Sequence, residues 1–313
     1  MVHPRLTTLL VCLTLLAASG AAPAAAQGIP PTYLPLILNG EPAAQTLFYG
    51  LDFSPYMAGQ SPNQGTKISE AQLRARMQIV AAHTGWVRSY GMDSGLELTG
   101  KVAHELGLKA ALGAWLGRDL TANQAQIDSL IQAANAGEAD QLIVGSETLY
   151  RGDLTEAQLV KYIQQVRKAA PAGIPIGVAD VASEFQSHPA VTRAVDVVLA
   201  NIYPYWNGSD VANAANDLTV AYQGVKTAAG TKPVLISETG WPTCGETRGL
   251  AVPSLQNAQT YQQTFLAWAR ANQVGYYYFE AFDEAWKAAP GSQVEACWGI
   301  WDQAGNAKPG LLP

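Results

Sequence analysis

The sequence predicts a single (β/α)8 barrel, an α/β fold of the TIM-barrel type, and three observations favour it. Eight apolar, β-type runs follow one another between residues 47 and 282, and most are separated by segments with helical spacing of apolar residues. About 240 residues hold this pattern, close to the roughly 250 that are typical of such barrels. An open doubly wound sheet is the alternative, but no G-x-G-x-x-G turn follows the first run.

The eight predicted strands are rich in β-branched and aromatic residues. In order, they cover residues 47–53, 86–91, 108–116, 141–147, 174–180, 195–206, 233–238 and 274–282. The clearest helices span residues 69–83 and 155–170, and each opens with Ser or Thr followed by acidic residues. The helical pattern is weakest at residues 184–193, between the fifth and sixth strands.

The first 46 residues resemble targeting and linking segments. His3 and Arg5 precede an apolar run at residues 6–16, and an Ala-rich cleavage site follows at 24–26. The run is too short to span a bilayer. We expect a signal peptide at residues 1–26, a Pro-rich linker at 27–46 and the (β/α)8 domain at 47–313; an uncleaved anchor is the alternative. The mature protein is then expected outside the cell, either free, at the cell surface or in the periplasm.

Composition argues against several classes of function. The formal net charge is -6 at pH 7 and no run of Lys or Arg occurs, which disfavours nucleic-acid binding. One of the four His lies in the signal, and His83, His104 and His188 do not have metal-ligand spacing. We therefore expect no metal and no cofactor. The mature chain is expected to be a monomer that does not bind a membrane.

Carboxylates stand at the ends of several predicted strands, where a barrel of this kind carries its chemistry. They are Asp52, Glu147, Asp180, Glu238 and Glu280. Glu147 ends the fourth run and Glu238 the seventh, so the two should face each other across the barrel mouth. Opposed carboxyl groups suit glycoside hydrolysis, in which one donates a proton and the other acts as nucleophile or base. For either Glu alone, an ion pair with Arg or Lys is the alternative.

Four motifs in order along the chain, and a fifth directly behind them, carry a resemblance to a known family. They are VGSETLYRGDLT (144–155), NIYPYW (201–206), ISETGWPT (236–243) and YFEAFDEAWK (278–287), followed by WGIWD (298–302). Together they resemble glycoside hydrolase family 17, and its bacterial and fungal cell-wall branch more than its plant enzymes. That family contains secreted β-1,3-glucanases and β-1,3-glucan transglycosylases.

The resemblance implies a role for each of the two central Glu residues. Glu147 matches the general acid/base, and Glu238 matches the nucleophile. The implied activity is that of a retaining hydrolase whose substrate is a β-1,3-glucan oligosaccharide or polysaccharide of the laminarin type. The alternatives are a β-1,3-glucan glucanosyltransferase that uses the same two residues, or a non-catalytic glucan-binding protein of the cell wall.

The resemblance also implies further substrate-binding residues. Glu280, with Glu284 and Lys287, matches an accessory charged cluster at the eighth strand. The family usually has Asn directly before the acid/base, and this chain has Ser146 instead. In related barrels that Asn donates to the sugar 2-OH, a contact that strengthens in the transition state. Ser is a shorter donor.

Aromatic residues follow several predicted strands and are candidates for stacking on pyranose rings; the alternative for each is core packing at the barrel rim. These candidates are Tyr203, Tyr205 and Trp241, with Trp206 balanced between the two readings. Tyr90 and Asp52 are further substrate-binding candidates. Tyr90 and Arg88 are expected to orient a catalytic carboxylate, and Tyr90 to hydrogen-bond Glu238; the alternative for both is an interior layer of the barrel. One of Trp286, Trp298 and Trp301 is expected to stack on sugar.

Two cysteines remain once Cys12 is assigned to the signal. Cys244 and Cys297 form an even pair in a chain that is expected to be secreted, so they are candidates for a disulfide; two free thiols are the alternative. Cys244 follows the seventh strand and Cys297 the eighth. Because both segments lie at the same face of the barrel, a bridge between them would brace its rim.

Overall fold

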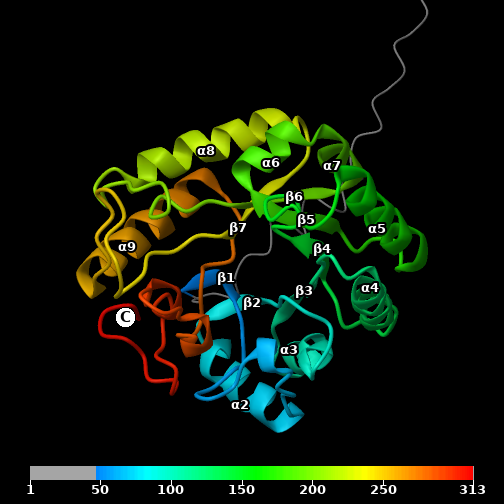
Figure 1. Cartoon of the computed structure of the whole chain (residues 1–313), viewed down its shortest axis with the longest axis horizontal. Helices are drawn as coiled ribbons and strands as arrows, with labels where there is room; N and C mark the ends of the chain where they lie inside the picture. Colours follow the sequence, from blue (N-terminus) through cyan, green and yellow to red (C-terminus); the bar gives the residue numbers. More distant parts are fainter. Residues whose placement is uncertain (1–46, 313) are drawn as a thin grey trace, which may run out of the picture.

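A ring of parallel strands, surrounded by helices, forms the part of the chain that the computed structural model describes, residues 47–312 (Figure 1). Each strand pairs in parallel with the next one along the chain. The seven strands are β1 (Phe48–Asp52), β2 (Thr84–Arg88), β3 (Lys109–Ala114), β4 (Gln141–Ser146), β5 (Ile176–Val181), β6 (Val197–Asn201) and β7 (Val234–Glu238). The predicted signal peptide (1–26) and linker (27–46) lie outside the described residues.

Residues 276–278 take the place of an eighth strand and close the ring. Tyr276 bridges to Ile236 of β7, and Tyr278 bridges to Leu51 of β1, both in parallel. The amide of Tyr278 donates to the carbonyl of Gly50 at 2.9 Å. The (β/α)8 barrel is thereby confirmed, although within the eighth predicted strand, 274–282, only Tyr276 and Tyr278 form bridges to β7 and β1.

The second strand lies earlier than the sequence predicted. The pattern favoured residues 86–91, whereas β2 ends at Arg88. The amide of Ser89 still bonds the carbonyl of Ala111 at 3.0 Å, but the chain then leaves the ladder. Tyr90 therefore stands beyond the strand, at the barrel mouth.

The helices pack outside the ring (Figure 1). They are α2 (Glu70–Ala81), α3 (Thr99–Glu105), α4 (Leu120–Asn135), α5 (Glu156–Ala169), α6 (Ala182–Ser187), α7 (Pro189–Ala194), α8 (Ala214–Ala229) and α9 (Leu255–Asn272). Short 3-10 turns are η1 (Pro62–Gln64), η2 (Leu96–Leu98), η3 (Ala285–Lys287) and η4 (Val294–Ala296). None of the helices within residues 47–312 is long and apolar enough to cross a membrane.

Helix ends follow the expected start and stop signals. Ser69 accepts a hydrogen bond from the amide of Gln72 at the start of α2, and Thr155 forms a capping box with Gln158 at the start of α5. The weakly patterned segment 184–193 is split into α6 and α7 around Pro189. A proline disfavours helical geometry in the residue before it, and one helix therefore ends where the next begins.

Apolar side chains fill the barrel interior and separate the mouth from the opposite end. Every stave contributes to this inner cluster, β6 with two side chains: Tyr49, Trp86, Ala111, Ile143, Ala179, Val197, Leu199, Leu235 and Tyr277. The Tyr277 hydroxyl donates to Gln141 Oε1 at 2.7 Å. A second, larger core lies between the strands and the helices. Space for a ligand is therefore found at the carboxyl ends of the strands.

Cys244 and Cys297 form a disulfide, as predicted. It joins the loop after β7 to η4, and the amide of Thr243 also donates to the carbonyl of Cys297 at 2.9 Å. Both segments therefore form one braced side of the barrel mouth.

Candidate active site

Glu147 and Glu238 line one cavity of about 680 Å³ at the carboxyl ends of the strands. Glu238 is the last residue of β7, and Glu147 directly follows β4. Glu238 is 6% exposed, while Glu147 is partly buried. The two carboxyl groups thus share one partly enclosed space, as the sequence pattern favoured.

The backbone turns sharply at the end of β4. The register with β5 shifts between Ile143 and Ser146, and φ is +89° at Gly145 and +52° at Glu147. A left-handed conformation is uncommon for a residue other than glycine and costs roughly 1 kcal/mol. A side chain at Gly145 would also approach Thr148 Oγ1 within 2.5 Å. This turn breaks the alternation of the strand and sets the direction in which Glu147 leaves it.

The surroundings of Glu147 favour its protonated form. Burial, followed by the charge of Glu238, raises the pKa of Glu147 to about 7. Asn201 Nδ2 donates to Glu147 Oε1 at 2.9 Å and opposes part of that shift. Ser237 Oγ donates to Asn201 Oδ1 at 2.6 Å, which fixes the orientation of the amide. Glu147 therefore carries a proton over much of the pH range below about 7.

Asn201 was not singled out from the sequence. It belongs to the NIYPYW motif and ends the apolar run of β6. Its signal in the sequence is a polar side chain at the carboxyl end of an apolar strand.

Both carboxylate oxygens of Glu238 accept hydrogen bonds. Arg88 Nη1 donates to Oε1 at 2.8 Å, and the Tyr203 hydroxyl donates to Oε2 at 2.8 Å. Tyr90 was expected to make this second bond, but its hydroxyl instead accepts from Arg88 Nη1 at 3.1 Å. Because Tyr90 follows Arg88 closely on the same chain segment, it contacts the guanidinium, and Tyr203 reaches Glu238 from beyond β6. The two donors hold the Glu238 carboxylate in one orientation.

Arg88 connects the ends of four strands. Its guanidinium also donates to Asp52 Oδ1 at 2.8 Å, Ser146 Oγ at 3.1 Å and the carbonyl of Ser237 at 2.9 Å. Asp52 was expected to bind substrate; instead it is fully buried, does not line the cavity and pairs with Arg88. Ser146 does line the cavity. Asp52 therefore holds Arg88 in position without lining the cavity, while the Ser146 side chain lines it.

The charged cluster after the eighth stave forms one wall of the cavity. Lys287 Nζ lies 2.8 Å from Glu280 Oε2 and also pairs with Glu284. Burial raises the pKa of Glu280, whereas the Lys287 ammonium lowers the pKa of Glu284 although burial opposes it. Glu284 accepts further bonds from Ser54 and from Trp286 Nε1. Glu284 and Lys287 line the cavity, and Glu280 lies buried behind them.

The aromatic candidates divide into cavity-lining and core residues. Tyr203 and Trp206 line the cavity. Tyr205 and Trp241 are each 1% exposed, and Trp241 Nε1 donates to the carbonyl of Val252 at 3.0 Å. The prediction that these two contact substrate is wrong, because their rings pack against each other at a centroid distance of 5.7 Å and fill the core below the rim.

Of the three tryptophans after the eighth stave, one lines the cavity. Trp286 does so, while Trp298 and Trp301 are buried. Asp180, another strand-end carboxylate, does not line it; the amides of Leu149 and Val181 bond its oxygens at 3.0 and 2.9 Å. Asp180 therefore holds the turn that follows Glu147.

Three further residues of the cavity wall were not predicted from the sequence. Trp115 directly follows β3, Arg151 belongs to the turn after Glu147, and Glu295 lies in η4. Burial raises the pKa of Glu295, which belongs to η4 beside the disulfide. These side chains reach the cavity only because tertiary contacts fold the loops over the barrel mouth.

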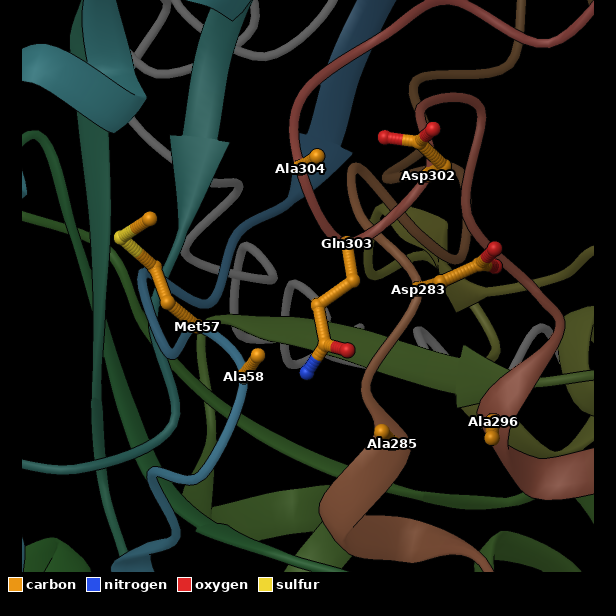
Figure 2. Close-up of a pocket in the computed structure, with 8 residues that line it drawn as sticks. All are labelled: Met57, Ala58, Asp283, Ala285, Ala296, Asp302, Gln303 and Ala304. Carbon is orange, nitrogen blue, oxygen red and sulfur yellow. The ribbon is translucent and has the colours of Figure 1, made fainter.

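A second recess, of about 520 Å³, shares no lining residue with the cavity that holds Glu147 (Figure 2). Met57 and Ala58 stand on one side of it and the C-terminal segment with Asp302 on the other. Its Asp283 accepts from Lys308 Nζ at 2.7 Å and from the amide of Gly299 at 2.9 Å. That carboxylate is therefore used to hold the loop. Within residues 47–312, no group of three or more His, Cys, Asp or Glu is placed to hold a metal ion.

Known proteins share both the sequence and the fold of this chain. The family model of the BtgE/BtgC glycoside hydrolase domain matches residues 50–299. A glucan 1,3-beta-glucosidase of Candida albicans is 30% identical over 78% of this chain and 87% of its own. Another, of Saccharomyces cerevisiae, is 30% identical over 81% of this chain and 88% of its own.

Among solved structures, a glycoside hydrolase family 17 beta-1,3-glucanosyltransferase from Rhizomucor miehei superimposes with a TM-score of 0.76. It is 31% identical, and the match covers 84% of this chain and 96% of that one. An active-site mutant of that enzyme is known in complex with laminaritriose.

Proposed function

This chain belongs to glycoside hydrolase family 17, and on that premise we propose that it is a retaining glycosidase that cleaves β-1,3-glucan. One observation carries the proposal. A carboxyl group with its pKa raised to about 7, Glu147, shares a cavity with a second carboxylate, Glu238, that two donors hold in place. The relatives named for action on 1,3-β-glucan supply the substrate class.

The two carboxyl groups divide the reaction between them. Glu147 donates its proton to the glycosidic oxygen while the bond from that oxygen to the anomeric carbon breaks. Glu238 attacks the anomeric carbon and forms a glycosyl ester. In the second step the Glu147 carboxylate removes a proton from water, the water oxygen attacks the anomeric carbon, and the ester bond to Glu238 breaks. Two inversions leave the configuration of the sugar retained.

Neighbouring side chains position these groups. Asn201 orients Glu147, and Arg88 with Tyr203 orients Glu238. On the cavity wall, Ser146 offers a hydroxyl where the family usually has an amide. Glu284 and Lys287 offer an acceptor and a donor for sugar hydroxyls.

Transfer to a second sugar is the alternative outcome on the same site. The Rhizomucor relative is named a glucanosyltransferase. In transfer, a sugar hydroxyl replaces water in the second step, and Glu147 removes its proton in the same way. A purely glucan-binding role would be favoured if either Glu were missing, and both are present.

Incubation with laminari-oligosaccharides and separation of the products tests the proposal. Products shorter than the substrate indicate hydrolysis, and longer ones indicate transfer. Glu147→Gln and Glu238→Gln should each abolish both activities. Glu105→Gln is the matched control, because Glu105 is exposed on α3 and pairs with Arg74. Full activity in either active-site variant would remove that residue from the mechanism.

We further propose that residues 1–26 direct export and that residues 27–46 are a linker leading into the domain. Residues 47–313 then act outside the cell as a monomer. The disulfide supports an oxidising compartment. Intact-mass analysis of the secreted protein would show whether the chain begins near Gln27, and its elution volume on size exclusion would show whether it is a monomer. A mass that includes residues 1–26 would contradict signal cleavage.

A further inference from the structure

We propose that Trp115 is a stacking platform for a glucosyl unit that lies outside the two units flanking the scissile bond. The inference rests on the proposed function and names a residue that sets its preference for chain length. Trp115 follows β3 directly, beside the strand that leads to Glu147, and it lines the same cavity. Because Trp115 lies in the loop after β3, whereas Glu147 and Glu238 stand at the ends of β4 and β7, we assign it to a sugar unit beyond the reacting ones.

Exposure sets this side chain apart from other tryptophans of the barrel mouth. Trp115 is 46% exposed, whereas Trp206 and Trp286, which line the same cavity, are partly buried. A large aromatic surface left open to water inside a ligand cavity gains free energy when an apolar face covers it. A pyranose ring of a β-linked glucan presents such a face.

Arg151 fixes the indole in place. Its guanidinium carbon lies 4.3 Å from the centre of the Trp115 ring, so one part of the ring surface is already covered. Arg151 in turn donates to the carbonyl of Ser146 at 2.6 Å, the carbonyl of Leu116 at 3.0 Å and Asp153 Oδ2 at 2.7 Å. With its donors engaged, the guanidinium acts as a flat support for the ring.

The same contacts tie the platform to the catalytic turn. Leu116 is next to Trp115 in the chain, and Ser146 is next to Glu147, so Arg151 bridges the two loops. The amide of Arg151 also donates to the carbonyl of Glu147 at 3.0 Å. A sugar on Trp115 would therefore be held at a set distance from the group that donates the proton.

Chain-length dependence of turnover tests the platform. Trp115→Ala should lower kcat/KM for laminarihexaose about tenfold, as expected when an aromatic contact of about 1.4 kcal/mol is lost. The value for laminaribiose, which is too short to reach the platform, should change less than about twofold. Trp115→Phe should recover much of the loss. Tyr150→Ala is the matched control, because Tyr150 is exposed and does not line the cavity.

Binding of the same two sugars, measured by calorimetry in the Glu238→Gln background, gives a readout that needs no turnover. Adding Trp115→Ala should weaken the binding of laminarihexaose about tenfold and should change the binding of laminaribiose little. If the wild type turns over both sugars and Trp115→Ala lowers kcat/KM equally for both, the platform is overturned and the proposed function stands. If Trp115 strengthens binding of laminarihexaose but the wild type turns over neither sugar, the proposed function is overturned and the platform stands. If there is neither turnover nor binding that depends on Trp115, the platform and the proposed function are both overturned.

Discussion

At the scale of single residues, the protonation of Glu147 depends first on burial and then on the charge of Glu238. Since the protonated form starts the proposed reaction, kcat/KM for a laminari-oligosaccharide should fall as the pH rises through about 7. Glu238→Gln removes the neighbouring charge, so it should lower the pKa of Glu147. Carbon NMR of labelled Glu side chains would measure this shift. An unchanged pKa would contradict the electrostatic part of the explanation.

The raised pKa of Glu147 also makes the free energy of unfolding depend on pH. The folded protein holds the Glu147 pKa at about 7 against an ordinary 4.5, so folding favours the protonated form. The stabilisation is therefore complete below pH 4.5 and is lost as the pH rises through 7. Glu147→Gln cannot titrate. Above pH 7 it should be more stable than the wild type by about 3 kcal/mol, and near pH 4 the two should be similar.

Urea unfolding at pH 4 and pH 8 checks this expectation. Glu105→Gln serves again as the control, because its exposed carboxyl should change stability little at either pH. Equal stability of Glu147→Gln and the wild type at pH 8 would show that the ionised Glu147 is not destabilising where it stands.

At the scale of elements, the side of the mouth formed by the loop after β7 and by η4 depends on the Cys244–Cys297 bond. The two residues are 53 apart in the chain. Closing a loop of that length restricts the unfolded chain, and the chain-entropy treatment gives about 4 kcal/mol of stabilisation. Replacing both cysteines with Ser should lower the free energy of unfolding by about that amount. Calorimetry with and without reductant measures it, and an unchanged melting temperature would contradict it.

Strand positions were the part of these elements that the sequence predicted best. Periodicity placed β4 and β7 so that Glu147 and Glu238 came to one mouth. It did not show that Tyr203, rather than Tyr90, donates to Glu238, because the early end of β2 depends on tertiary packing. It likewise could not separate Trp241, in the core, from Trp115, on the rim. Both follow strands, and only the loop path decides which ring is covered.

At the scale of the whole molecule, closure of the barrel depends on a close approach between β1 and the eighth stave. A Cβ at Gly50 would lie 2.5 Å from the ring of Tyr277 and 2.9 Å from the carbonyl oxygen of Tyr276. Gly50→Ala should therefore destabilise the protein by about 1–3 kcal/mol through overpacking. Gly85→Ala in β2 is the matched control, since the nearest atom to its Cβ would be 3.5 Å away. Equal unfolding midpoints in urea for the two variants would contradict this, because they would show that the eighth stave can shift to make room for the added methyl group.

The closed ring brings together side chains from distant parts of the chain. Arg88 of β2 reaches Asp52, Ser146 and Glu238, which three other strand ends supply. The fold was predictable because eight repeated units have a regular pattern. The contacts among those ends were not, because each depends on the register and bulges of several strands at once.

Trapping of the covalent intermediate tests the central claim most directly. A laminaribiosyl fluoride that carries fluorine at the 2-position of the reacting sugar should form a glycosyl ester that hydrolyses slowly. Mass spectrometry of the digested protein is expected to find the added disaccharide on the peptide that contains Glu238, and none in the Glu238→Gln variant. A label on another residue would contradict the account. So would hydrolysis of the fluoride that leaves the enzyme active and gives a product of inverted configuration.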